Sequence, residues 1–124
     1  MIKHLKNILL PLLAVLALTG CKDDPQRHLQ LAQWYSQKGL IDEAILEYRE
    51  VTRLLPADVK ALSRGDYELL ADAHYRLALM YTKKDWWDYA LKEAETSFEL
   101  LPTREHYDIV TLLRKRVDLQ ETGS

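Results

Sequence analysis

Two stretches of the chain, 41–55 and 87–101, carry apolar or small residues every three or four positions. In the first stretch these are Ile41, Ala44, Ile45, Tyr48, Val51, Thr52 and Leu55, and in the second Trp87, Ala90, Leu91, Ala94, Ser97, Phe98 and Leu101. This spacing places them on one side of an α-helix and leaves polar residues on the other. Pro56 and Pro102 follow directly, and the residue before a proline disfavours helix. The pattern predicts two amphipathic helices that end near residues 55 and 101.

Both stretches belong to a longer internal repeat, in which equivalent residues stand 46 positions apart. The matching pairs are Leu31-Ala32 with Leu77-Ala78, Tyr35 with Tyr81, Ala44 with Ala90, His28 with His74, and Leu54-Leu55-Pro56 with Leu100-Leu101-Pro102. A repeat of this size indicates one supersecondary unit that is used twice. The matches on the amino-terminal side of each stretch predict a second helix in each unit.

The spacing of these residues resembles the tetratricopeptide repeat (TPR), a helix–turn–helix unit of about 34 residues. The resemblance implies repeats at 25–58 and 71–104, with an insert at 59–70 between them. It predicts an all-α fold, in which two TPR-like helix–turn–helix repeats plus a C-terminal capping helix form a short α-solenoid. The chain departs from the family pattern in three respects. Histidine replaces the usual Trp, Asp85 replaces the Gly between the helices of the second repeat, and the insert breaks the spacing.

Local signals predict where the remaining helices begin and end. Gly65-Asp66 indicates a stop and a new N-cap, so the first helix of the second repeat is expected to start near Tyr67. Asp85 is expected to cap the helix that follows it, and Thr103 to cap a last helix over 104–120. The folded domain is therefore predicted at 28–120, with a disordered tail at 121–124.

The amino terminus has a different pattern. A short positive segment with Lys3 and Lys6 precedes an apolar run at 8–18, which is too short to span the roughly 30 Å of a bilayer core. These features predict a secretory signal at 1–20. The run ends in Leu18-Thr19-Gly20-Cys21, which resembles the lipobox of bacterial lipoproteins. The resemblance implies cleavage after Gly20 and lipid attachment at Cys21, with 21–27 as the lipidated residue and its tether.

Two alternatives to lipidation are a plain signal peptide with a chance cysteine and a signal anchor. The lipobox interpretation also accounts for the single Cys, which has no partner for an internal disulfide. Lys22 follows Cys21 where some lipoproteins carry an Asp for retention in the inner membrane. We therefore expect a lipid-anchored protein of the cell envelope, held in the outer membrane and facing the periplasm.

The net charge of the chain bears on which classes of molecule it could bind. The chain has 17 Lys and Arg against 19 Asp and Glu, for a formal net charge of −2. Loss of Lys3 and Lys6 with the signal makes the mature chain more acidic. Because nucleic acid requires a basic footprint, this balance argues against a nucleic-acid partner.

The sequence has no phosphate-binding loop, zinc-ligand spacing or nucleophile elbow. His28 and His74 are the one pair that points to a metal, but two histidines without a third ligand make a weak site. Repeated packing positions explain them better. The prediction is a protein without catalytic residues, metal or cofactor. The alternative is an accessory subunit of an envelope enzyme, with a weak metal site at these histidines.

The TPR resemblance implies a concave binding face made by the first helix of each repeat. Positions such as Leu29 belong to that face, and the predicted partner-binding residues are Gln30, Gln33, Gln37, Tyr75, Arg76, Leu79 and Lys83. Trp34 and Trp86 are further candidates. Trp34 is either an exposed contact or covered by residues 22–27, and Trp86 is expected to contact a partner or lipid headgroups. Two competing interpretations are a solvated face that binds nothing and packing of Tyr75 and Leu79 against the last helix near Ile109 and Leu113.

The predicted function is a membrane-anchored protein–protein interaction adaptor or assembly factor at the periplasmic face of the cell envelope. Its expected partner is an envelope protein or peptide, and self-association is a second expected mode. The membrane is a partner through the lipid on Cys21.

Overall fold

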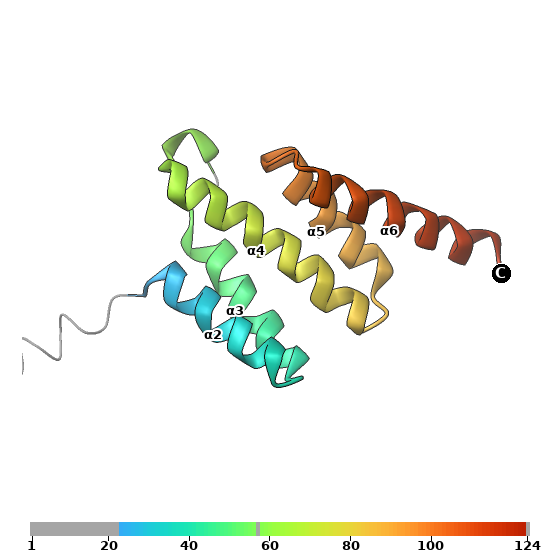
Figure 1. Ribbon diagram of the computed structural model, residues 1–124, viewed down its shortest axis with the longest axis horizontal. Coiled ribbons are helices and arrows are strands. Elements are labelled where there is room, and N and C mark those ends of the chain that lie inside the picture. Colours follow the sequence, from blue (N-terminus) through green and yellow to red (C-terminus); the bar gives the residue numbers. More distant parts are fainter. Residues whose placement is uncertain (1–22, 57, 124) are drawn as a thin grey trace, which may run out of the picture.

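A computed structural model describes residues 23–56 and 58–123 (Figure 1). Its α-helices are α2 (Pro25–Gln37), α3 (Ile41–Leu54), α4 (Arg64–Lys83), α5 (Trp87–Leu100) and α6 (Arg104–Thr122), with a 3-10 turn, η1 (Val59–Ala61), between α3 and α4. These residues contain no β-strand. The predicted all-α fold of two helix–turn–helix units and a C-terminal helix is confirmed. The predicted signal and Cys21 lie outside the described residues.

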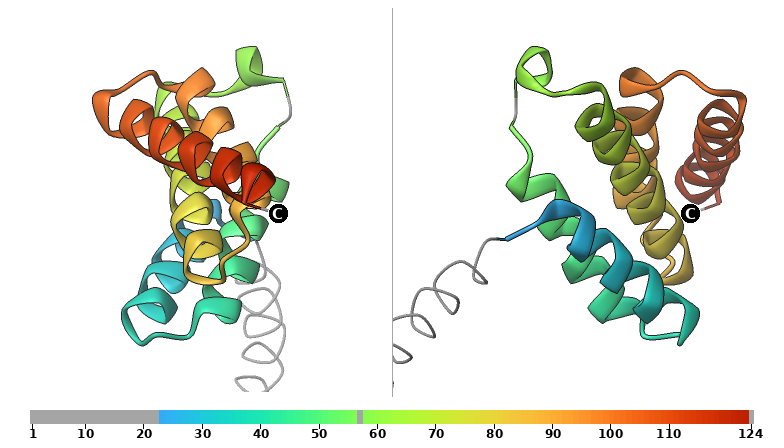
Figure 2. Two further views of the ribbon diagram at one scale, coloured as in Figure 1. Left: turned by 90° about the vertical axis from the view of Figure 1, so that its right-hand side faces the viewer. Right: turned by 60° about the vertical axis from the view of Figure 1, so that its left-hand side comes forward.

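The helices form a continuous row, because each packs against the helices before and after it in the chain. The row runs from α2 to α6, and α2 also touches α4 (Figures 1 and 2). Small residues allow the close approach of neighbouring helices. Ala32, Ala44, Ala78, Ala90 and Ala94 are all completely buried. The repeat-equivalent alanines therefore occupy equivalent packing positions in both units. None of the helices described is long and apolar enough to cross a membrane.

The turns within the two units have the same conformation despite their different sequences. Gly39 has φ +77° and Asp85 has φ +59°, both in the left-handed region. The backbone N–H of the next residue then bonds back to the helix, from Leu40 to Tyr35 at 2.9 Å and from Trp86 to Tyr81 at 3.0 Å. The prediction that Asp85 caps α5 is wrong, because Trp86 holds the N-cap position without a side-chain bond. Asp85 instead occupies the position of a helix-ending glycine.

Asp85→Gly is expected to raise the free energy of unfolding by about 0.5–1 kcal/mol, because glycine adopts a left-handed conformation without a Cβ penalty. Urea denaturation followed by circular dichroism measures the change. Lys92→Gly, in the exposed interior of α5, is the control and should lower stability by about 1 kcal/mol. Destabilisation by both substitutions would show that Asp85 has a stabilising role that its backbone does not reveal.

The insert between the repeats contains the start of α4. The Ser63 hydroxyl accepts a hydrogen bond from the Asp66 N–H at 3.1 Å and caps the helix. The helix therefore begins at Arg64, and the predicted start near Tyr67 is wrong because Ser63, not Asp66, is the cap. The Tyr67 hydroxyl donates to the Leu100 carbonyl and joins the start of α4 to the end of α5.

The last helix agrees with its predicted start and extends past its predicted end. The Thr103 hydroxyl caps α6 by accepting from the His106 N–H at 3.2 Å. Val110 and Leu113 from this helix are buried in the core. The helix continues to Thr122, so the first two residues of the predicted disordered tail at 121–124 are helical.

Candidate functional site

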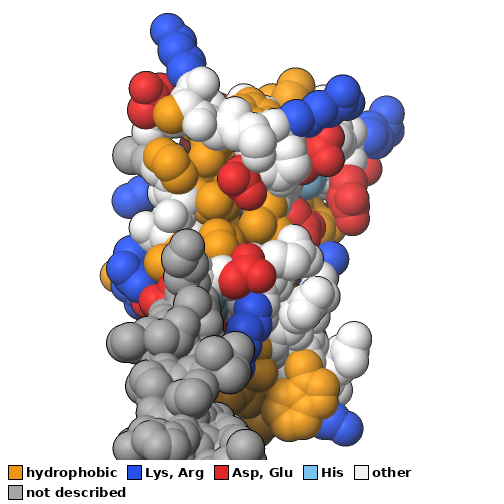
Figure 3. Space-filling model, turned by 90° about the vertical axis from the view of Figure 1, so that its left-hand side faces the viewer, with side chains coloured by type: hydrophobic (Ala, Val, Ile, Leu, Met, Phe, Trp, Pro, Cys, Tyr) orange, Lys and Arg blue, Asp and Glu red, His pale blue; other side chains and the backbone are white. Residues whose placement is uncertain are grey.

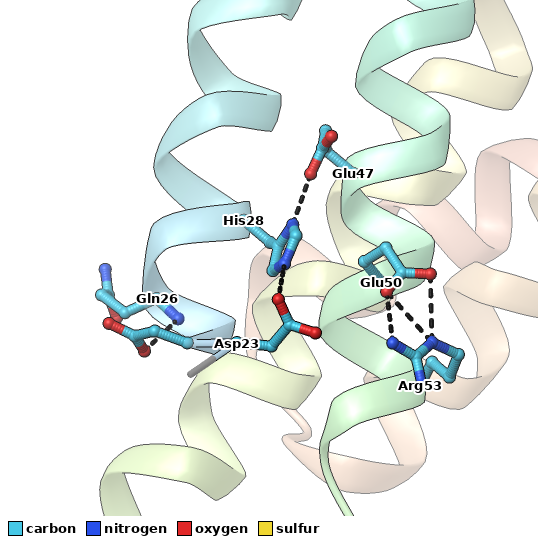
Figure 4. A network of polar contacts seen from close by, with 7 residues as sticks. Asp23, Gln26, His28, Glu47, Glu50 and Arg53 are labelled. Carbon is cyan, nitrogen blue, oxygen red and sulfur yellow. Dashed lines mark hydrogen bonds and ion pairs between the residues drawn. The ribbon is translucent and has the colours of Figure 1, made fainter. Parts of the chain in front are cut away.

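The chain between the predicted lipid site and the domain is shorter than the sequence indicated. The Asp24 carboxylate caps α2 by accepting from the Gln26 N–H at 3.0 Å, and Asp23 Oδ1 lies 3.7 Å from His28 Nε2 (Figure 4). Residues 25–27 are helical. The predicted tether at 21–27 is therefore corrected, because residues 23–27 are already part of the fold. Only Lys22 separates Cys21 from the first described residue.

The two repeated histidines each bind a glutamate on the next helix. His28 Nδ1 lies 2.5 Å from Glu47 Oε2, and His74 Nδ1 lies 2.5 Å from Glu93 Oε2. The glutamates are themselves 46 positions apart, so the whole pair is repeated. Each pair ties the first helix of a unit to the second, which gives both histidines a structural role. Within 23–56 and 58–123, no three His, Cys, Asp or Glu residues are grouped to hold a metal ion.

One part of the predicted groove is used in folding. The Tyr75 ring stacks on His106 of α6, with centroids 4.9 Å apart and an interplanar angle of 23°. His106 Nδ1 is held in turn by the carbonyls of Leu101 at 2.8 Å and Ser97 at 3.1 Å. Burial raises the pKa of Tyr75, and the carboxylate of Glu105 raises it further. Tyr75 thus packs against the last helix, through His106, as one of the two competing interpretations expected.

Arg76, also in the predicted groove, takes part in contacts within the fold. Arg76 Nε donates to Asp72 Oδ2 at 2.8 Å, and the guanidinium also interacts with the Tyr48 hydroxyl. Burial lowers the pKa of Arg76, but Asp72 and Tyr48 outweigh it and leave a raised value.

The other predicted partner-binding residues differ in exposure. Gln30, Gln37 and Lys83 are exposed, Gln33 is half-buried, and Leu79 is half-buried against the core. The expectation that Leu29 lines this face is wrong, since it is 6% exposed in the core.

A cavity of about 690 Å³ lies elsewhere, at the turn between α4 and α5. Its walls come from α3, the end of α4, the start of α5 and the end of α6. The lining residues are Arg49, Tyr81, Asp85, Trp86, Trp87, Asp88, Tyr89, Lys92, Glu93 and Gln120. A second cavity, of about 580 Å³, lies near Pro56 and Leu100. None of the seven predicted partner-binding residues lines either cavity.

Three aromatic rings form one wall of the larger cavity. The centroid of Tyr81 lies 5.9 Å from both Trp86 and Tyr89, which are 6.3 Å from each other. Tyr81 is 7% exposed, whereas Trp86 is 46% and Tyr89 65% exposed. Burial raises the pKa of Tyr81. A buried ring therefore supports two rings that face solvent.

Charged residues surround this aromatic wall. Lys84 Nζ lies 5.4 Å from the Trp86 ring centroid and 2.9 Å from Asp42 Oδ1 at the start of α3. Arg49 and Lys92 supply further positive charge at the cavity, and Asp88 supplies negative charge. The sequence indicated Trp86 as a contact residue, but it missed Tyr89 and Arg49. The available signal for Tyr89 was its position outside the packing stripe of α5.

Neither a protein-family model nor a curated protein matches the sequence. The fold and surface therefore define the class of molecule. It is a short stack of two helix–turn–helix units closed by a C-terminal helix. Figure 3 shows one side of this stack, where acidic, basic and hydrophobic side chains are interspersed without a large patch of one charge.

Proposed function

We propose that this protein is a lipid-anchored adaptor or assembly factor at the periplasmic face of the cell envelope. The lipobox-like residues ending at Cys21 support the anchor, and Lys22 supports the outer membrane. The TPR resemblance supports a role in binding proteins rather than in catalysis. We propose an envelope protein or peptide as its partner.

The observation that carries the proposal is the aromatic wall of the larger cavity. Folding explains Tyr81, which is buried, but it does not explain why Trp86 and Tyr89 remain largely exposed beside it. Trp and Tyr dominate the binding energy of many protein interfaces, particularly in pockets surrounded by polar residues. A volume of about 690 Å³ lies within the range of ligand pockets and would accept an apolar side chain of a partner.

The predicted groove on α2 and α4 is a second proposed contact surface, more polar than the first. Gln30, Gln37 and Lys83 are exposed there, and Arg76 keeps about a third of its side-chain area accessible. Tyr75 has a folding role through His106, so its loss would weaken any binding indirectly. For this reason the aromatic cavity is the primary site of the proposal.

Affinity purification of the lipidated protein from envelopes should identify the partner, and variants then locate its site. Trp86→Ala and Tyr89→Ala are each expected to weaken binding by about 1–3 kcal/mol, because each substitution removes one aromatic ring from the interface. Calorimetric titration with the purified partner measures the affinity. Tyr107→Ala is the control, since Tyr107 on α6 is 52% exposed and lies outside the cavity.

Melting temperatures of the same three variants separate binding from stability. A similar loss of affinity in all three, or a loss that only follows the melting temperature, would contradict the proposed site.

A further inference from the structure

One side of α2 carries an apolar stripe that the core does not use. Arg27, Leu31, Trp34 and Lys38 follow one another at helical spacing and share about 60° of the helix surface. Leu31 is 37% exposed and Trp34 is 50% exposed. The buried residue Ala32 lies on the opposite side of the helix. The stripe is therefore not a part of the interface between α2 and the rest of the stack.

The charge of α2 differs from that of the other helices. It is the only one of the five described α-helices without an Asp or Glu, although the chain as a whole is acidic. Arg27 lies at one end of the stripe and Lys38 at the other, with Lys38 Nζ 5.8 Å from the Trp34 ring centroid. A Trp and Leu between basic residues is the composition of helices that lie in the bilayer interface.

The short connection to Cys21 brings this stripe near the bilayer. Asp24 accepts from the Gln26 N–H at the α2 N-terminus, Asp23 lies 3.7 Å from His28, and the helix dipole offsets a part of their negative charge. The four Cα–Cα steps from Cys21 to Pro25 reach at most about 14 Å, and α2 itself is about 20 Å long. A lipid on Cys21 therefore keeps the whole of α2 within reach of the membrane surface.

We infer that α2 lies along the bilayer surface. Leu31 and Trp34 enter the boundary between headgroups and acyl chains, and Arg27 and Lys38 contact anionic headgroups. This inference rests on the proposed lipid anchor, since the anchor is what brings α2 to the membrane. It assigns the stripe to a lipid surface rather than to a protein partner.

Fluorescence quenching tests the inference with the full-length lipidated protein. The protein is reconstituted in vesicles of phosphatidylethanolamine and phosphatidylglycerol whose acyl chains are brominated near the headgroup. Trp34→Phe is expected to abolish most of the lipid-dependent quenching of tryptophan emission. Trp86→Phe, the control of similar exposure, should retain it. Arg27→Gln and Lys38→Gln should each lower the equilibrium constant for docking of α2 about fivefold, which corresponds to about 1 kcal/mol per charge.

Flotation of the same vesicles reports separately on the anchor. Failure to float would contradict the proposed lipidation, and with it the inference. Flotation without Trp34-dependent quenching would overturn the inference alone and leave the anchor intact. Quenching that disappears in Trp86→Phe instead would also overturn it, as would cross-linking that places Trp34 against a second copy of the chain.

Discussion

Cys21→Ser is expected to release the protein from the membrane. The substitution removes the thiol that carries lipid in the proposed mature protein, and no described helix is long and apolar enough to cross a bilayer instead. Two or more buried acyl chains give stable membrane anchoring, at about 0.8 kcal/mol per CH₂ group. Fractionation after high-salt and carbonate washes should therefore change from fully membrane-bound to soluble, or to an uncleaved precursor.

Lys22→Ala is the matched control, because it changes the neighbouring residue and leaves the thiol in place. Mass spectrometry of the amino-terminal peptide should detect acyl chains in this control and none in Cys21→Ser. The lipobox interpretation fails if Cys21→Ser stays in the washed membranes with its signal removed.

Leu113→Ala is expected to lower the free energy of unfolding by about 2–5 kcal/mol. Leu113 is completely buried between α6 and the rest of the core, so its truncation leaves a cavity. Domains of this kind have a total stability of about 5–15 kcal/mol, and the expected loss is a large share of it. Urea denaturation followed by circular dichroism measures the effect.

The adjacent Leu112 provides a control on the same helix, since it is 68% exposed. Leu112→Ala should change stability by less than about 0.5 kcal/mol. Equal effects of the two substitutions would mean that α6 does not pack on the stack through the Leu113 side. The comparison therefore tests whether the C-terminal helix is a part of the cooperative core.

The positions of the helices could be predicted from the sequence because the signals that determine them are local. The apolar stripes of α3 and α5 follow the period of a helix, and Pro56 and Pro102 end them. Thr103 caps α6 as predicted, and the buried alanines recur at the repeat distance. The predicted start of α4 is wrong because Ser63 and Asp66, three positions apart, are both good caps, and only the backbone distinguishes them.

The candidate site could be predicted only in part, because its residues come together through contacts far apart in the chain. The helical pattern left Tyr75 outside the packing stripe, yet His106 of α6 takes it into the fold. The aromatic cavity joins Arg49, Tyr89 and Gln120 from three different helices. The spacing in the sequence indicates which side of its own helix a residue occupies, but not which helix covers that side.

Local patterns in the sequence therefore predict the repeat, the helices and the alanines between them, and they indicate an export signal and a lipid site. The partners of the histidines follow from the packing of the helices, because Glu47 and Glu93 lie one helix away from them. The same packing also explains why Asp85 adopts the conformation of the equivalent Gly39, since the second turn must follow the same path to pack α5 against α4. The local pattern of apolar residues and caps determines where the helices lie in the chain. The packing between helices determines which surfaces remain free to bind.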